Sequence, residues 1–190
     1  PHKMALSEDG LYLYVGLRGA NRIVKFNMLT KQTEATIPLG GNFWGLNFAH
    51  DIVCLPGSLN TIAVARANED GSGTSIALYA DNAQLPQTVD SDNFMTITSN
   101  GRMFSGNNRL SEPEIRELIV TPSGVVAGVT YHRFLRDFGV LVESQGELIY
   151  SSKGQVVNAG MSTPEVLVTY PLRNSGPSAV EPAPDSTVVF

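Results

Sequence analysis

The sequence is short of the residues on which several function classes depend. Cys54 is the only cysteine among 190 residues, so neither an internal disulfide nor a CxxC zinc pair can form. The three histidines lack HExxH and His-x-His spacing, which argues against a zinc enzyme. No Gly-x-Ser-x-Gly elbow supports an α/β-hydrolase triad. No apolar run approaches the roughly 18 residues of a membrane-spanning helix.

Charged residues are also scarce, at 16% of the sequence, and acidic residues outnumber basic ones. The 13 basic and 18 acidic residues give a formal net charge of −5. That balance gives no support to a nucleic-acid or anionic-membrane partner. The 42% hydrophobic content is enough for one sizeable core or two small domains. We therefore expect a folded chain with no nucleic-acid partner, no cofactor and no transmembrane segment.

The sequence does contain a repeat. Polar turns, usually with Gly, lead into short β-prone strands at 7–15, 56–64, 98–105 and 144–150, and a fifth copy occupies 184–190. Equivalent apolar positions in the five copies are 49, 41, 45 and 40 residues apart; they are Leu13, Ile62, Met103, Leu148 and Val188. A period in the forties with several short strands is typical of a β-propeller. The repeat therefore predicts an all-β fold.

Each period contains four candidate strands, the number in one antiparallel propeller blade. The second strand of each period is apolar on both faces, as expected for sheets stacked face to face. The predicted strands are 3–7, 11–17, 22–27 and 33–39; 51–55, 61–66, 75–79 and 84–89; 94–98, 102–105, 115–120 and 124–131; and 140–143, 147–151, 155–158 and 166–170. The blades of this single domain cover residues 2–49, 50–90, 91–135 and 136–174, with a partial blade at 175–190.

Three segments of the first period are similar to a known repeat. They are 6–15, 21–27 and 35–40, and together they resemble a blade of the YVTN-type bacterial propellers. The usual Tyr-Val-Thr-Asn string is Tyr14-Val-Gly-Leu17 here, and Asn27 stands where an Asp is usual. Segments 51–57, 76–81 and 146–157 resemble repeats of large bacterial surface and secreted propellers. The resemblance implies a propeller fold and a secreted, periplasmic or cell-surface location.

The length does not fit a closed ring of the usual size. At about 44 residues per blade, the chain holds roughly four blades and the start of a fifth, whereas members of the resembled family usually close with seven. Four-bladed propellers of the hemopexin type usually join their first and last blades by a disulfide, which a single cysteine cannot supply. We expect a fragment of a larger, seven-bladed propeller, completed by missing residues or by another chain.

Polar residues recur at equivalent positions in successive blades. An acid or histidine stands eleven residues before each of the first four apolar anchors, and a cation stands four to six residues after each of them; the fifth copy has Pro177 in the first position. In a propeller, the connections between blades and the loops joining second to third strands lie on one face, the top. The top-face candidates for ligand binding are His2, Asp51, Asp92, Asp137, Arg18, Arg66, Asn107, Asn108, Arg109 and Lys153.

Three interpretations of these polar residues stay open. A carboxylate at a strand entry can accept backbone N–H bonds or pair with an arginine, and repetition in every blade favours that structural role. A polar funnel could instead bind a sugar, a peptide or a partner loop. Converging carboxylates could also hold a hard cation such as calcium.

Three further features carry weaker signals. Phe43, Trp44 and Phe48 could form a stacking platform for a sugar or peptide, although such residues more often plug the core. The acidic, Gly-rich stretch 68–75 is typical of a flexible loop tip. Cys54 lies in an apolar run, which indicates an inert, buried thiol.

Two function classes follow. Repetition of the same residue types favours a non-catalytic extracellular or cell-surface propeller, which binds a protein or carbohydrate for adhesion or scaffolding through its top face. The alternative is a propeller enzyme, such as a lactonase, a lyase or a dehydrogenase subunit, with its site at the channel mouth. The candidate residues for that alternative are Asp51, Asp92, Asp137, His50, Asn107 and Asn108.

Overall fold

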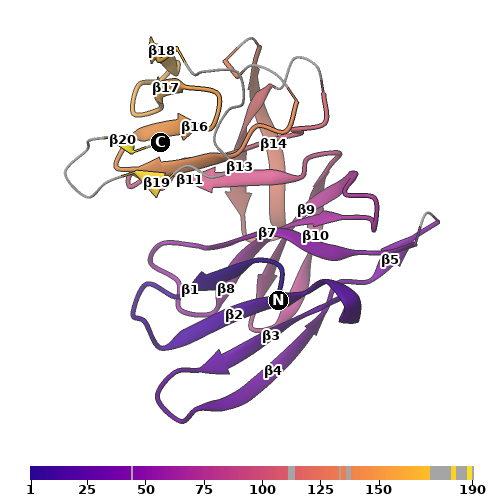
Figure 1. Ribbon diagram of the computed structural model, residues 1–190. Helices are drawn as coiled ribbons and strands as arrows, with labels where there is room; N and C mark the ends of the chain where they lie inside the picture. Colours follow the sequence, from indigo (N-terminus) through magenta and orange to yellow (C-terminus); the bar gives the residue numbers. More distant parts are fainter. Residues whose placement is uncertain are drawn as a thin grey trace. The chain divides into compact units, whose positions relative to one another are not determined.

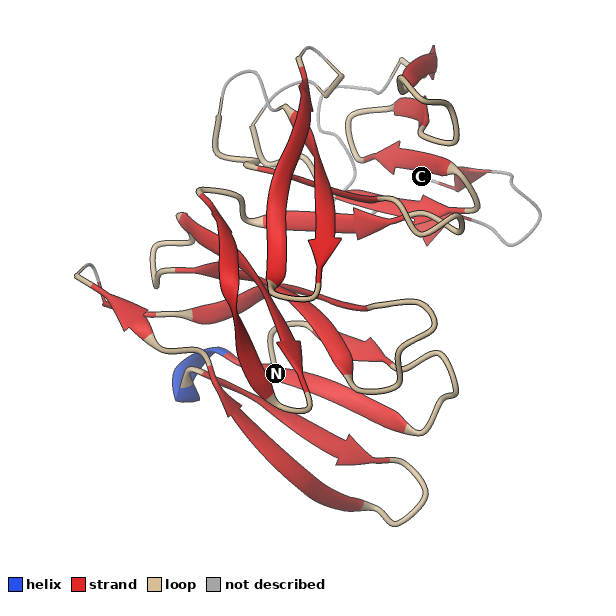
Figure 2. Ribbon diagram, turned by 180° about the vertical axis from the view of Figure 1, so that it is seen from behind, coloured by secondary structure: helices blue, strands red, loops and turns tan. Residues whose placement is uncertain are grey.

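The computed structural model in Figure 1 describes residues 1–43, 45–110, 114–132, 134–135, 138–171, 181–182 and 188–189. Almost all regular structure in these residues is β-strand, and the one helical element is a single 3-10 turn, η1 (Arg18–Ala20). Figure 2 shows this predominance of strands. Within the described residues, no helix is long and apolar enough to cross a membrane. The predicted all-β class is therefore confirmed.

The first sheet is a four-stranded antiparallel meander. Its strands are β1 (Met4–Leu6), β2 (Tyr12–Leu17), β3 (Arg22–Asn27) and β4 (Gln32–Pro38), hydrogen-bonded in chain order. Asn27 shapes the β3–β4 turn, because its Oδ1 accepts the backbone N–H groups of Leu29 and Thr30, both at 2.9 Å. An Asp could accept the same two bonds, which explains why Asn serves at this position.

Three more runs of four strands follow along the chain. They are β7 (Phe48–Cys54), β8 (Thr61–Ala67), β9 (Gly73–Ala80) and β10 (Ala83–Asp90); β11 (Phe94–Ile97), β12 (Met103–Gly106), β13 (Ile115–Thr121) and β14 (Gly124–Tyr131); and β15 (Val142–Gln145), β16 (Leu148–Ser151), β17 (Gln155–Asn158) and β18 (Glu165–Thr169). Two short pairs complete the described strands: β5 (Gly41–Asn42) with β6 (Gly45–Leu46), and β19 (Glu181–Pro182) with β20 (Val188–Val189).

The second and third runs belong to one eight-stranded sheet, in the order β11-β12-β13-β14-β10-β9-β8-β7. One parallel bridge, between Gln87 and Gly124, joins β10 to β14. Gly124 has φ +132°, and a Cβ there would lie 2.3 Å from the Gln87 carbonyl oxygen. Only glycine allows both the backbone conformation and the close approach.

The chain divides into two compact units. The first contains residues 1–95 and 120–126, and the second contains residues 96–119 and 127–190. In the second unit, Tyr150 and Val156 pack together with Leu148. Buried residues of that unit also include Met103 and Phe104, which are each 1% exposed.

The core of the first unit lies between the β1–β4 sheet and strands β7 to β9. The first sheet contributes Tyr14, Ile23 and Ile37, and Leu39 follows directly after it; the second contributes Ala49, Ile52, Ile62, Val64, Ala77 and Tyr79. Cys54 packs against this cluster, and burial raises the pKa of its thiol to about 11. The thiol is thus protonated near neutral pH, as expected for an inert cysteine.

All sixteen strands expected from the four repeats are present, with ends that differ by up to three residues from the predicted ones. The sequence reasoning missed the β5–β6 hairpin, η1 and β19. The number of blades and the division into four-stranded blades stay predictions, as does the single domain with its five segments.

The core predicts the cost of a cavity in the first unit. Ile23 is fully buried between the two sheets, so Ile23→Ala should lower the free energy of unfolding by about 2–5 kcal/mol. Leu29→Ala is the control, because Leu29 is 79% exposed and its loss should change stability by less than about 0.5 kcal/mol. Urea unfolding measures both values. Equal midpoints for the two variants would contradict the assigned core.

Candidate functional site

The structure divides nine of the ten predicted top-face residues between the two units. His2, Arg18, Asp51, Arg66 and Asp92 belong to the first unit, and Asn107, Asn108, Arg109 and Lys153 belong to the second. Asp137 lies outside the described residues. The predicted convergence of three aspartates on one channel mouth therefore stays a prediction.

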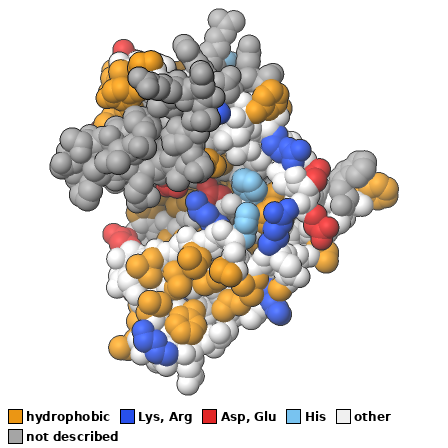
Figure 3. All heavy atoms as spheres, viewed as in Figure 1, with side chains coloured by type: hydrophobic (Ala, Val, Ile, Leu, Met, Phe, Trp, Pro, Cys, Tyr) orange, Lys and Arg blue, Asp and Glu red, His pale blue; other side chains and the backbone are white. Residues whose placement is uncertain are grey.

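An aromatic and cationic cluster forms where the chain start meets strand β7. The ring centroid of His2 lies 5.0 Å from that of Phe48 and 6.0 Å from that of His50. The Arg18 guanidinium carbon lies 4.3 Å from the centroid of the Phe48 ring, a favourable cation–π distance. Figure 3 shows two adjoining histidine side chains with Lys or Arg side chains beside them. We name His2, Lys3, Arg18, Phe48 and His50 the histidine cluster.

A close approach of two strands brings the chain start to β7. The backbone N–H of His2 donates to Gly16 O at 2.8 Å, and the N–H of Gly16 donates to Lys3 O at 2.8 Å. These bonds extend the pairing of β1 with β2. A Cβ on Gly16 would lie 3.1 Å from Ala49 Cβ, so the absence of a side chain lets β2 pack tightly on β7.

His50 sits on an irregularity of β7. The pairing with β8 matches Ala49 to Arg66 and Asp51 to Ala65, which leaves His50 as the extra residue. A bulge of this kind redirects a side chain and is common next to functional sites. The only sequence signal for this position is a histidine beside an expected aspartate, because an apolar pattern does not reveal a bulge.

Burial and charge keep both imidazoles deprotonated near neutral pH. Burial lowers the pKa of His50, and this effect outweighs nearby Asp51 and a hydrogen bond with the Asn93 backbone, both of which favour the protonated ring. Burial also lowers the pKa of His2, and the neighbouring cations Arg18 and Lys3 add to that effect. A neutral imidazole with a pKa below 6.5 can accept a proton at pH 7.

Asp51 is fixed by three contacts. Its Oδ1 accepts the Ile52 N–H at 3.0 Å and lies 3.0 Å from Lys3 Nζ, while its Oδ2 accepts the Met95 N–H at 3.1 Å. The residue is 7% exposed. A buried carboxylate that accepts two backbone bonds tethers β7 to the start of β11, which is the structural role considered for this position.

Arg66 makes its contacts within the β8–β10 part of the sheet. Its Nε and Nη2 donate to Ser75 Oγ at 2.9 and 2.6 Å, and its Nη1 donates to Gln84 Oε1 at 2.7 Å. Asp92 is buried, and its carbonyl oxygen would lie 2.7 Å from a Cβ on Gly73. The ion-pair partner of Asp51 is Lys3, which is not one of the predicted top-face cations.

The β8–β9 loop borders an open pocket of about 610 Å³, lined by Asn42, Asn68, Glu69, Asp70, Ser72, Gly73 and Thr74. Asp70 accepts from Ser72 N at 2.8 Å and from Ser72 Oγ at 3.0 Å. Arg18 donates through Nη2 to the Glu69 carbonyl oxygen. The loop predicted to be a flexible tip is therefore held by hydrogen bonds, and Arg18 connects it to the Phe48 ring.

The predicted residues of the second unit shape turns. Asn107 Oδ1 accepts the Arg109 N–H at 2.9 Å, and the buried Asn108 donates through Nδ2 to Val140 O at 3.2 Å. The N–H of Lys153 donates to Ser151 Oγ at 3.1 Å. These contacts give the asparagines a structural function that accounts for their presence at strand ends.

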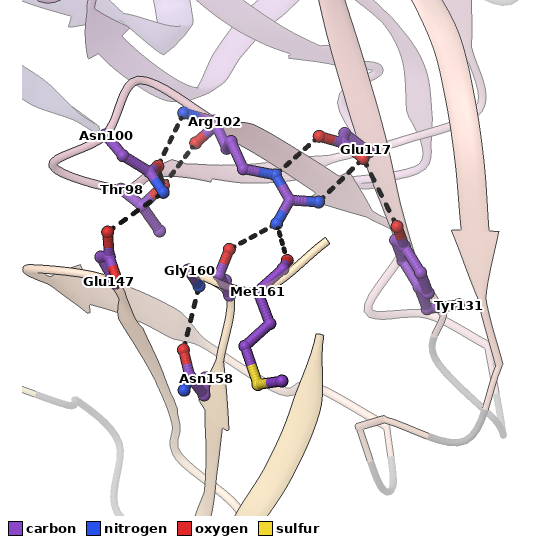
Figure 4. A network of polar contacts seen from close by, with 10 residues as sticks. Thr98, Asn100, Arg102, Glu117, Tyr131, Glu147, Asn158, Gly160 and Met161 are labelled. Carbon is purple, nitrogen blue, oxygen red and sulfur yellow. Dashed lines mark hydrogen bonds and ion pairs between the residues drawn. The ribbon is translucent and has the colours of Figure 1, made fainter. Parts of the chain in front are cut away.

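Arg102 is a polar residue that the sequence reasoning missed (Figure 4). Its Nε and Nη2 donate to Glu117 at 2.8 and 3.0 Å, and its Nη1 donates to the carbonyl oxygens of Ala159 and Met161. The Arg102 guanidinium lowers the pKa of the Glu117 carboxyl. Arg102 thus binds the Glu117 carboxylate through two nitrogens and also binds residues 159–161, so it connects segments of the second unit that are far apart in sequence.

The described residues contain no group of three or more His, Cys, Asp or Glu side chains arranged to hold a metal ion. The carboxylate-ringed cation site considered from the sequence thus has no support within the part of the chain that the structure describes. The histidine cluster instead offers two imidazoles that can bind a proton, beside the cations Lys3 and Arg18.

Comparison with known proteins gives the fold. No family model and no curated protein matches the chain. Hydrazine synthase of Kuenenia stuttgartiensis is similar with a TM-score of 0.62 and 14% identity, over 83% of this chain and 43% of that one. A protein provisionally named a 6-phosphogluconolactonase, from Bacteroides uniformis, matches with a TM-score of 0.61 and 15% identity, over 87% of this chain and 53% of that one.

A third solved structure, U3-55K, matches with a TM-score of 0.51 and 16% identity, over 85% of this chain and 47% of that one. The chain thus spans about half the length of the solved structures that it matches. At these identities the similarity shows the fold alone, which is all-β and propeller-like.

The comparisons correct the predicted function. The sequence reasoning favoured a non-catalytic extracellular binding module because the same residue types recur in each repeat. That prediction is wrong: the similar structures include a hydrazine synthase and a provisionally named 6-phosphogluconolactonase. The recurring residues Asp51 and Asn108 have structural contacts, and the histidine cluster includes His50, which lies outside the recurring positions.

The contacts of Asp51 predict a stability cost. Asp51→Asn removes the charge that faces Lys3 and one of the two backbone acceptors, so it should lower the free energy of unfolding by about 1–3 kcal/mol. The control Asp90→Asn changes an exposed side chain on β10 and should stay within about 0.5 kcal/mol. Chemical denaturation tests the pair. An unchanged midpoint for Asp51→Asn would refute the structural role.

The histidine cluster predicts a loss of stability in mild acid. The folded pKa values of His2 and His50 lie below 6.5, which is close to the value in an unfolded chain. Near and below pH 6.5 the unfolded chain therefore binds more protons than the folded chain, so the free energy of unfolding decreases as the pH is lowered. Well above pH 6.5 both histidines are neutral in both states, and their full contribution to stability is present. Unfolding titrations at pH 7.5, 6.5 and 5.5 should show a smaller decrease for His50→Gln than for the wild type. The same decrease in both proteins would contradict the burial of His50.

Proposed function

We propose that the chain is part of a propeller-fold hydrolase that opens a lactone or similar cyclic ester at the histidine cluster. The observation that carries this proposal is the pairing of the His2 and His50 rings, 6.0 Å apart between ring centroids, beside Arg18 and Lys3. Burial lowers the pKa of both imidazoles, which favours their neutral form. Neutral imidazoles supply a base near pH 7, and the cations supply positive charge where an ester oxygen becomes negative.

In the proposed reaction, one imidazole takes a proton from a water molecule whose oxygen attacks the lactone carbonyl carbon. The ring C–O bond then breaks, and the imidazolium returns the proton to the departing oxygen, which gives a hydroxy acid. His50 fits the role of base, because one ring nitrogen bonds to the Asn93 backbone and the second can accept a proton. Arg18 fits the role of electrostatic stabiliser, because Phe48 and Glu69 O hold its guanidinium beside the rings.

The comparisons support an enzyme of this fold without assigning a substrate. One similar structure is provisionally named a 6-phosphogluconolactonase, and this chain covers 53% of it. The proposal also includes the finer architecture: four blades of four strands, at 2–49, 50–90, 91–135 and 136–174, in a larger propeller. The four successive runs of strands support that division. The YVTN-type resemblance and the secreted, periplasmic or cell-surface location stay predictions.

A lactone-hydrolysis assay tests the function. Acid release from δ-gluconolactone and 6-phosphogluconolactone is followed above the spontaneous background, at pH 5.5 to 8. We expect His50→Gln to lower kcat/KM by about 10²–10⁴-fold, the usual contribution of a general base. Wild-type activity should decline only below pH 6.5, because protonation removes the base.

The matched control is His132→Gln, since the His132 side chain is 68% exposed and contacts Glu114 in the second unit. This variant should keep the wild-type rate. The proposed function fails if neither lactone is hydrolysed above background, or if His50→Gln and His132→Gln are equally active.

A further inference from the structure

The pocket beside the β8–β9 loop has the size of a small-molecule site. Its volume of about 610 Å³ lies within the range of roughly 300–1,000 Å³ that is usual for such sites. The described residues that line it come from the loop and its ends, apart from Asn42 of β5, and all of them belong to the first unit. The roles proposed for the histidine cluster do not involve this pocket.

Hydrogen bonds hold the loop in the shape that forms the pocket. The Asn68 N–H donates to Ser72 O at 3.0 Å, and the Gly71 N–H donates to Asn68 O at 2.8 Å. Asp70 accepts from both the N–H and the hydroxyl of Ser72. Asn93 Nδ2 donates to Gly71 O at 3.3 Å, which connects the loop to the segment before β11. The pocket is therefore formed before a ligand binds, which lowers the entropic cost of binding.

The lining offers hydrogen-bonding groups suited to the hydroxyls of a sugar. It contains two side-chain amides, two carboxylates and two hydroxyls, which belong to Asn42, Asn68, Glu69, Asp70, Ser72 and Thr74. Amides and hydroxyls both donate and accept, and a carboxylate accepts strongly from a hydroxyl. Within the described part of the chain, the buried Oδ1 of Asn68 has no hydrogen-bond partner. A sugar hydroxyl that donates to Asn68, after a small rotation of that side chain, would satisfy this atom.

Charge disfavours a phosphorylated ligand in this pocket. The described lining includes two exposed acids, Glu69 and Asp70, and no basic residue. A phosphate group carries about two negative charges near pH 7, so it would be repelled by both carboxylates. Arg18 is the cation that reaches the loop, and it already binds the Glu69 carbonyl oxygen and lies over the Phe48 ring. Repulsion of an unwanted ligand is a common source of specificity.

Arg18 places the pocket beside the histidine cluster. Its Nη2 donates to the carbonyl oxygen of Glu69, which lines the pocket, and its guanidinium carbon lies 4.3 Å from the Phe48 ring centroid. We propose that the pocket binds the hydroxyl groups of the lactone ring and that the substrate is an unphosphorylated sugar lactone. This inference rests on the hydrolase proposal for the reaction, but the binding preference can be measured without turnover.

Titration with D-glucose and with glucose 6-phosphate tests the pocket, because the two sugars differ only in the phosphate and neither contains an ester. In amide NMR spectra of the chain, glucose should shift the Gly71, Ser72 and Gly73 signals until they saturate. Glucose 6-phosphate should bind at least about tenfold more weakly in Kd. No shift with glucose, or equal Kd values for the two sugars, would overturn the inference whether or not a lactone is hydrolysed.

The double variant Glu69→Gln/Asp70→Asn tests the carboxylates. It removes both charges and leaves an oxygen at residue 70 that can accept the Ser72 N–H, so the loop should keep its shape. This variant should bind glucose 6-phosphate nearly as tightly as glucose, and continued discrimination would contradict the role of the charges. If the double variant does not fold, Glu69→Gln alone should reduce the discrimination, because the Glu69 side chain is exposed.

Asp81→Asn is the matched control, because Asp81 is an exposed acid in the turn at the other end of β9. It should keep the wild-type preference for glucose. In the lactone assay, the wild type should show a higher kcat/KM for δ-gluconolactone than for 6-phosphogluconolactone. The reverse order would overturn this inference and leave the hydrolase proposal standing, whereas hydrolysis of neither lactone would defeat the hydrolase proposal and leave the binding preference measured by titration unaffected.

Discussion

Packing of the β1–β4 sheet against strands β7 to β9 is the contact from which the features of the first unit follow. Tyr14, Ile23 and Ile37 from one sheet meet Ile52 and Tyr79 from the other, and each is at most 3% exposed. Burial of a side chain of this size contributes about 1.5–3 kcal/mol. The same contact carries the chain start to β7, because Gly16 presents no side chain at the interface. His2 and Lys3 thereby reach His50 and Asp51, which lie some 48 residues further along the chain.

Burial at this contact also sets the chemistry of the polar groups. Lys25 is 6% exposed and is held by Asn60 Oδ1 at 2.8 Å, with the Tyr12 ring centroid 3.7 Å from its Nζ. Asp51 is offset by Lys3 and two backbone N–H groups. His50 has weaker compensation, so burial lowers its pKa. Lys25 and Asp51 are therefore stabilised in their charged forms by partners, whereas His50 can exchange a proton near neutral pH.

Most of the strand pattern could be predicted from the sequence, because strand identity is a local property of alternating and apolar runs. Arg22–Asn27, Gly124–Tyr131 and Gln155–Asn158 have the predicted bounds, and the other predicted strands differ only at their ends. The site was less predictable. Equal spacing located Asp51 and Asn108 as repeating polar positions, but spacing alone cannot distinguish a backbone acceptor from a ligand.

Features that depend on distant partners lie beyond a repeat pattern. His50 owes its position to a bulge of one residue, and Arg102 binds partners that lie 15 and 57 residues further along the sequence. Leu13 and Val15 alternate with Tyr14 in β2, and only Tyr14 of these three enters the core.

Nuclear Overhauser contacts between the aromatic ring protons of His2, Phe48 and His50 measure the assembled site most directly. The ring centroids of His2 and Phe48 lie 5.0 Å apart, and those of His2 and His50 lie 6.0 Å apart. Cross-peaks from the His2 ring to the Phe48 ring are therefore expected in the folded protein, and they should vanish in urea. A folded chain whose His2 ring shows no contact with Phe48 or His50 would contradict the packing of the first sheet on β7, and with it the histidine cluster.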